Sequence, residues 1–147
     1  MLRTLMLACV GAAVLGGCAA TQQAAAPFDP ATCYQRDFNI YFAGRSTELT
    51  DDAQRVIDGM GEAVRGCYIR EVRVIGETDE AGNAVTNDEI SERRAQVIAE
   101  YLASRVGWPR SRMVVAAAGE RGAVTEEGLN VPVRRRARII VEAQASE

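Results

Sequence analysis

The order of strand-forming and helix-forming segments constrains the fold of this 147-residue chain more than any other feature. Short runs rich in β-branched, aromatic or small apolar residues predict four strands. These runs are residues 38–42, 72–75, 113–117 and 137–141. Apolar residues at helical spacing fill the first two gaps between them. The alternation predicts an α/β sandwich, in which one sheet carries two helices on one face.

The first predicted helix has a recognisable start. Thr50 is a suitable N-cap, and Asp51 and Asp52 place negative charge in the first turn, where the helix dipole favours it. Apolar residues then recur at helical spacing and form an amphipathic face. They are Ala53, Val56, Ile57, Met60, Val64 and Cys67.

The second predicted helix follows a turn-forming segment at residues 77–83. We expect Asn87 or Asp88 to cap its start, because both side chains can accept a hydrogen bond from the first turn. Gly107 ends the helix and Pro109 prevents it from resuming. Its apolar positions are Ile90, Val97, Ile98, Tyr101 and Leu102.

Residues 1–17 have the layout of a secretory signal peptide. Arg3 is their single positive charge, and the apolar run at 5–15 is too short to span a bilayer comfortably. Residues 15–18, Leu-Gly-Gly-Cys, resemble the lipobox of bacterial lipoproteins. That resemblance implies cleavage before Cys18 and attachment of fatty acyl chains, such as palmitate, to this residue. An ordinary signal peptide with a chance cysteine is the alternative.

The remaining chain divides into a tether, one domain and a tail. Residues 18–32 are rich in alanine and glutamine and contain two prolines, which is typical of a flexible tether behind a lipidated N-terminus. Residues 33–143 hold all the predicted helices and strands. We expect residues 144–147 to form a short frayed tail.

Composition argues against several classes of function. The net charge is −3 and both signs are mixed along the chain, whereas nucleic-acid-binding proteins show a clustered basic excess. The chain contains no histidine and no lysine, so the commonest general base, the commonest metal ligand and any Schiff-base nucleophile are absent. We therefore expect no enzyme activity, no cofactor and no metal site.

Two cysteines lie outside the signal peptide and the lipidation site. Cys33 and Cys67 would reach a compartment that permits disulfides. A disulfide between them would stabilise the fold by about 3–4 kcal/mol in the chain-entropy model. Two free thiols are the alternative.

Arg94 departs from the polarity pattern of the second helix. It lies four residues after Ile90 and four before Ile98, so it projects within the apolar face. A buried guanidinium must meet a carboxylate or reach open water. Asp79 is the nearest candidate, since it follows the second strand at the sheet edge where crevices open. The pair is either a structural salt bridge or a site for a zwitterion, with Asp79 binding an ammonium and Arg94 a carboxylate.

Further motifs extend this pattern. They are residues 40–42 (IYF), 46–50 (STELT), 76–82 (GETDEAG), Asn87, 90–95 (ISERRA) and 134–136 (RRR). Together they resemble the OmpA-like peptidoglycan-binding domain, a family that includes the peptidoglycan-associated lipoproteins. The likeness covers residues 37–142. It implies a β-α-β-α-β-β fold, with a mixed four-stranded sheet and two helices on one face.

The resemblance also implies a ligand. In the family an aspartate and an arginine hold the free zwitterionic end of diaminopimelate, in the peptide stem of peptidoglycan. These roles carry over to Asp79 and Arg94, while Thr78, Asn87 and Arg135 match supporting positions. The chemistry agrees with the pair of opposite charges expected from the polarity pattern.

Three positions depart from the family pattern. Glu77 stands where the family usually has histidine, and Arg134 stands where it has asparagine. Residues 42–44, Phe-Ala-Gly, replace a strand end that is usually Phe-Asp. The first two departures exchange charge near the site, and the third removes a polar group at its rim. Altered affinity, altered ligand preference and loss of binding are the expected consequences to test.

These features predict an outer-membrane lipoprotein whose domain faces the periplasm and binds peptidoglycan non-covalently, tethering the membrane to the cell wall. Ala19, which follows Cys18 in place of aspartate, indicates the outer membrane by resemblance to enterobacterial sorting. The predicted partners are peptidoglycan, the membrane and other envelope proteins. One alternative is a periplasmic protein-interaction lipoprotein with a drifted, non-binding site. Another is an envelope enzyme such as a wall hydrolase, although no catalytic constellation supports it.

Overall fold

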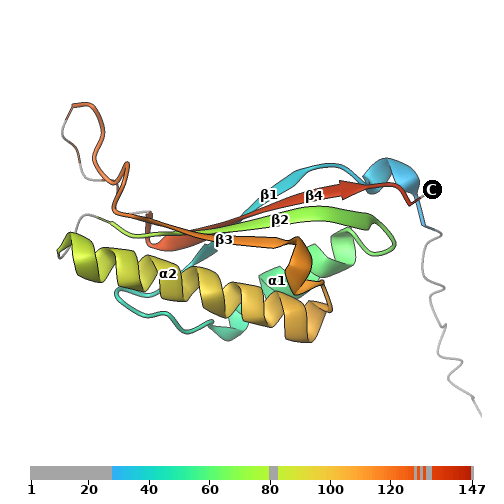
Figure 1. Cartoon of the computed structure of the whole chain (residues 1–147), viewed down its shortest axis with the longest axis horizontal. Coiled ribbons are helices and arrows are strands. Elements are labelled where there is room, and N and C mark those ends of the chain that lie inside the picture. The colour runs from blue at the N-terminus through green and yellow to red at the C-terminus, as the bar shows by residue number, and fades with distance from the viewer. Residues whose placement is uncertain (1–27, 80–82, 128, 130, 132–133, 147) are drawn as a thin grey trace, which may run out of the picture.

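A computed structural model describes residues 28–79, 83–127, 129, 131 and 134–146. The strands are β1 (Arg36–Tyr41), β2 (Tyr68–Glu77), β3 (Met113–Gly119) and β4 (Arg136–Gln144). The main helices are α1 (Asp51–Ala63) and α2 (Ala84–Tyr101), and the short helical segments are η1 (Pro30–Thr32), η2 (Leu102–Val106) and η3 (Arg110–Arg112). Figure 1 shows both main helices on the same face of the sheet. The predicted α+β sandwich and its β-α-β-α-β-β order are confirmed.

The sheet has the expected mixed arrangement. Its order is β1-β4-β2-β3, with β4 antiparallel to both neighbours and β2 parallel to β3. Arg136 pairs with Tyr41 on one side and with Glu77 on the other. The last residues of β1 and β2 therefore meet the first residue of β4. We call this the site end of the sheet, and the opposite end, where Tyr68 pairs with Gln144, the disulfide end.

The hydrophobic core lies between the sheet and the two helices. Its largest apolar side chains come from both main helices, from η2, from β1 and from the two central strands, and each is no more than 2% exposed. They are Ile40, Ile57, Met60, Ile98, Leu102, Val72, Val74, Ile139 and Val141. Full burial of one such side chain contributes about 1.5–3 kcal/mol to folding. This continuous apolar layer fixes the helices against the sheet.

Helix α1 begins as the sequence predicts and ends earlier. The Thr50 hydroxyl accepts a hydrogen bond from the Ala53 N–H at 3.2 Å, which satisfies one free donor of the first turn. Val56 was expected in the apolar face, but its side chain is 49% exposed. That expectation was wrong because the stripe facing the sheet is narrow. Cys67 also lies outside α1, which ends at Ala63.

Helix α2 begins four residues before the expected position. Its N-cap is Asn83, whose side chain accepts a hydrogen bond from Thr86 N–H at 2.9 Å. The prediction of Asn87 or Asp88 as the cap is wrong, because both lie within the first turns of the helix. Beyond Tyr101 the backbone continues as the π-helical segment η2, and Gly107 ends it with a positive φ of 82°.

The disulfide end holds the start of the described chain. Cys33 and Cys67 form the predicted disulfide, with 5.6 Å between their Cα atoms. Phe28 packs against Gly66, where an added Cβ would meet the Phe28 ring at 2.8 Å. Gln144, expected in the tail, belongs to β4. Residues 1–27, with the predicted signal peptide and Cys18, lie outside the described residues. None of the described helices is long and apolar enough to cross a membrane.

Candidate functional site

Arg94 is the most deeply buried charged side chain at the site end, with 1% of its surface exposed. Its Nε, Nη1 and Nη2 donate to the carbonyl oxygens of Ser46 (3.0 Å), Glu77 (3.0 Å) and Gly44 (2.6 Å). The expectation that this guanidinium must meet a carboxylate or open water was wrong. Backbone carbonyls satisfy it instead, and further N–H donors remain on Nη1 and Nη2.

The surroundings of Arg94 act on its charge in opposite directions. Burial lowers the pKa of the guanidinium, the negative charge of Asp79 raises it, and the positive charge of Arg135 lowers it. The Phe42 ring also lies under the guanidinium, with 5.0 Å from Cζ to the ring centroid. The net pKa of Arg94 is lowered, and its guanidinium is fixed on several sides within the influence of the Asp79 charge.

Asp79 lies just after β2 and is 18% exposed. Its Oδ2 is 3.5 Å from Nε of Arg135, which is 44% exposed. Asp79 and Arg94 are both described, and they form no ion pair with each other. The reading of this pair as a simple structural salt bridge is therefore not supported. One carboxylate at the site end is thus in contact with Arg135 and acts through its charge on Arg94.

Asn87 and Thr78 lie buried beside this carboxylate. The Asn87 amide donates to Oε2 of Glu120 at 2.7 Å and to the Asp79 carbonyl oxygen at 3.4 Å. The Thr78 N–H donates to the carbonyl oxygen of Gly119 at 2.8 Å. The Thr78 hydroxyl is buried and has no hydrogen-bond partner among the described residues. All five predicted ligand-binding side chains thus lie at the same end of the sheet.

A close approach between β2 and α2 sets the position of Arg94. A Cβ added to Gly76 would lie 1.7 Å from the carbonyl oxygen of Ser91, so only glycine allows the helix to pass this strand. The Ser91 hydroxyl in turn accepts from Gly119 N–H at 3.0 Å. Ser91 is one helical turn before Arg94, and this contact therefore brings the guanidinium over the end of β2.

Comparison with known proteins identifies the family of this chain. The OmpA family model matches residues 41–138, from the last residue of β1 to the start of β4, and this range includes the residues of the site end. The chain belongs to the OmpA family. No curated protein matches it by sequence.

Solved structures share the OmpA-like fold at low sequence identity. The OmpA-like domain of FopA1 from Francisella tularensis subsp. tularensis SCHU S4 has a TM-score of 0.63 at 17% identity, covering 74% of this chain and 75% of that one. The cell wall anchor of the T6SS from Pseudomonas aeruginosa gives 0.59 at 24%, covering 75% and 82%. The peptidoglycan-associated lipoprotein from Burkholderia pseudomallei gives 0.55 at 20%, covering 72% and 89%.

The two charged departures from the OmpA-like pattern contact each other. Nη2 of Arg134 is 3.4 Å from Oε1 of Glu77, and Nε of Arg136 donates to the other carboxylate oxygen at 2.8 Å. The sequence pattern alone did not predict this contact, although the opposite charges of Glu77 and Arg134 are a signal that could have indicated it. Glu120, which bonds Asn87, was also missed.

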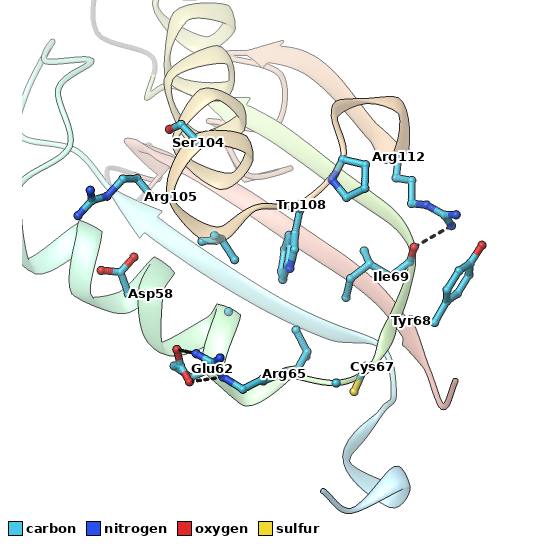
Figure 2. Close-up of a pocket in the computed structure, with 15 residues that line it drawn as sticks. Asp58, Glu62, Arg65, Cys67, Tyr68, Ile69, Ser104, Arg105, Trp108 and Arg112 are labelled. Carbon is cyan, nitrogen blue, oxygen red and sulfur yellow. Dashed lines mark hydrogen bonds and ion pairs between the residues drawn. The ribbon is translucent and has the colours of Figure 1, made fainter. Parts of the chain in front are cut away.

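A well-formed cleft lies at the disulfide end, away from these residues. It is a cleft of about 790 Å³ between the end of α1, η2 and the start of β2. Figure 2 shows Trp108 in this cleft, with Arg65 bonded to Glu62 and Arg112 bonded to the Ile69 carbonyl oxygen. Within the described ranges, no cluster of His, Cys, Asp and Glu suited to a metal ion occurs at either end.

Proposed function

We propose that this chain is an outer-membrane lipoprotein that binds peptidoglycan through the diaminopimelate of the stem peptide and so tethers the membrane to the cell wall. Membership of the OmpA family supports the proposal. So do two fold relatives described as a cell wall anchor and a peptidoglycan-associated lipoprotein. The domain acts by binding, without catalysis.

The observation that carries the proposal is that Asp79 and Arg94 lie at the same end of the sheet without forming an ion pair with each other. Carbonyl oxygens already hold the guanidinium in place, so its position does not depend on the carboxylate. Asp79 is partly exposed and available to bind an ammonium group. Arg94 retains N–H donors for a carboxylate. A free amino-acid end carries both groups on one carbon, which matches one charge of each sign.

Supporting contacts would come from neighbouring residues. The unpartnered Thr78 hydroxyl is available for a further hydrogen bond, and Asn87 fixes the Asp79 backbone. Arg135 is 44% exposed and would approach the ligand carboxylate or exchange its contact with Asp79. Each charge-assisted hydrogen bond contributes about 1.5–3 kcal/mol, so the affinity for one stem peptide is modest.

Anchoring would compensate for modest affinity. The described chain begins at the disulfide end, and the ten-residue strand β2 separates that end from the site by roughly 30 Å. The stretch from Cys18 to Phe28 reaches at most about 35 Å when fully extended. A lipid-anchored domain is thus confined beneath the membrane with its site directed away from the attachment point. Confinement raises the effective concentration of the wall.

Co-sedimentation of the full chain, kept in detergent, with purified sacculi tests the proposal. The wild type is expected to pellet with sacculi, and Asp79→Ala is expected to remain in the supernatant. Pelleting that Asp79→Ala and Arg94→Lys leave unchanged would contradict the site. A wild type that stays soluble would favour the protein-interaction lipoprotein, and release of soluble muropeptides would reveal an enzyme.

A further inference from the structure

Glu77 is a buried carboxylate that holds two arginines from a distant part of the chain. Its side chain is 6% exposed, and those of Arg134 and Arg136 are 19% and 20% exposed. Each guanidinium contacts a different carboxylate oxygen. For Arg136, burial lowers the pKa, but the hydrogen bonds and charges of Glu77 and Tyr41 together outweigh burial, and the net pKa is raised.

The cluster contains both neighbours of Arg135 and excludes Arg135 itself. Glu77 and Arg136 are cross-strand partners, so their side chains share one face of the sheet. The Phe42 N–H donates to the Arg135 carbonyl oxygen at 2.9 Å, which fixes the backbone at that point. The Arg135 side chain contacts Asp79 instead of Glu77, with 3.5 Å between its Nε and the Asp79 Oδ2.

Arg134 also forms a hydrogen bond with the turn that follows β3. Its Nη2 donates to the carbonyl oxygen of Arg121 at 2.7 Å. The preceding residue, Glu120, accepts the hydrogen bond from Asn87. One arginine side chain thus connects the end of β2 to the turn that supports Asn87.

We propose that Glu77 and Arg134 form a positioning clamp for the ligand site at Asp79 and Arg94. The clamp orients Arg135, and it fixes the turn at Glu120 and Arg121 whose Glu120 side chain bonds Asn87. Glu77 and Arg134 stand where the family pattern has histidine and asparagine, and here they form an ion pair with each other. The clamp rests on the proposed function, since it concerns the same ligand. Neither Glu77 nor Arg134 contacts the ligand; both act through Arg135 and the turn at residues 119–122.

Titration of the full chain in detergent with a diaminopimelate-containing stem peptide tests the clamp. Arg134→Gln should weaken binding by about three- to ten-fold, because residues in one network couple at this level. Arg134→Lys should bind within about two-fold of the wild type, since it keeps the positive charge that attracts Glu77. The double variant Glu77→Gln/Arg134→Gln should bind no more weakly than Glu77→Gln alone, because the two residues act as one unit.

Arg70→Gln is the matched control for Arg134→Gln, because it removes the same charge from an exposed arginine of β2 near the disulfide end. It should bind as the wild type does. Melting temperatures measured in parallel separate positioning from loss of fold, and the Arg134→Gln and Arg134→Lys pair decides the question if the Glu77 variants do not fold.

Three results overturn the clamp. If the wild type binds and Asp79→Ala abolishes binding, but Arg134→Gln binds normally, the clamp alone is wrong and the proposed function stands. If Arg134→Gln and Glu77→Gln weaken binding additively, Arg134 contacts the ligand directly and the positioning role fails. If the wild type does not bind the peptide, the proposed function fails and the clamp with it.

Discussion

The two ends of the sheet hold their charged residues in different ways. At the site end, Arg94 and Glu77 are buried, and their partners lie 17 to 59 residues away in sequence. At the disulfide end, Arg65 pairs with Glu62 three residues away, and these side chains are 74% and 63% exposed. A cleft of about 790 Å³ nevertheless lies at the disulfide end. Buried charge carries a desolvation cost, so its concentration indicates the functional end better than the size of a hollow does.

Among the substitutions considered, Arg94→Ala should have the largest effect on both the stability of the domain and its binding. It removes the donors for the carbonyl oxygens of Gly44, Ser46 and Glu77, and it empties a fully buried position. We expect a loss of about 4 kcal/mol in the free energy of unfolding and loss of sacculus binding. Urea denaturation and co-sedimentation measure the two effects. A stability within about 1 kcal/mol of the wild type would show that these bonds are weak.

Removal of the disulfide should affect stability and leave the site intact. Cys33→Ser with Cys67→Ser releases a covalent link across 34 residues and should lower the free energy of unfolding by about 3–4 kcal/mol. Peptide affinity should stay within about two-fold of the wild type while the domain is folded, because the link lies at the other end of the sheet. A large drop in affinity of the folded double variant would show that the disulfide end affects the site end, and it would contradict their independence.

Gly76→Ala should act on both the helix position and the site. Its Cβ would meet the Ser91 carbonyl oxygen at 1.7 Å, which forces α2 away from β2. We expect a loss of about 2–3 kcal/mol, in the range of overpacked cores, and weaker binding because Arg94 moves with α2. As a control, Gly59→Ala adds the same methyl group where nothing lies within 4 Å. Equal stability of the two variants would argue against the close contact.

Glu62→Gln should have the smallest effect on the thermal midpoint, and it serves as the exposed counterpart of Glu77→Gln. The pKa of Glu62 is lowered by its hydrogen bond with Arg65, but both groups are fully solvated, so loss of this pair should leave the thermal midpoint unchanged. Glu77→Gln makes the same chemical change at a buried carboxylate and should lower the midpoint clearly. Equal midpoints for these two variants would remove the distinction between the ends.

Local signals in the sequence were sufficient for the fold. The Thr50 cap, the apolar spacing of α1 and α2 and the strand-forming runs all act over a few residues, and the structure follows them. The start of α2 was misplaced because Asn83 and Asn87 are both suitable caps, and their choice depends on packing. Asn87 is instead buried against Asp79 and Glu120.

The environment of the site was less predictable. The polarity pattern marked Arg94 as unusual, but its partners are carbonyl oxygens 48 and 50 residues away, and no side-chain pattern reports backbone groups. The contact between Glu77 and Arg134 likewise depends on how the turn before β4 folds back. Sequence therefore identified which residues gather at the site end and could not show which of them bond one another.

The central claim is that Asp79 and Arg94 bind the charged end of an amino acid from opposite sides. Isothermal titration of the full chain in detergent, with a stem peptide that ends in free diaminopimelate and with the same peptide acetylated on that amine, tests it most directly. The account predicts saturable binding of the free peptide, no measurable binding of the acetylated one, and loss of binding in Asp79→Asn at an unchanged melting temperature. Equal binding of both peptides, or of wild type and Asp79→Asn, would contradict it.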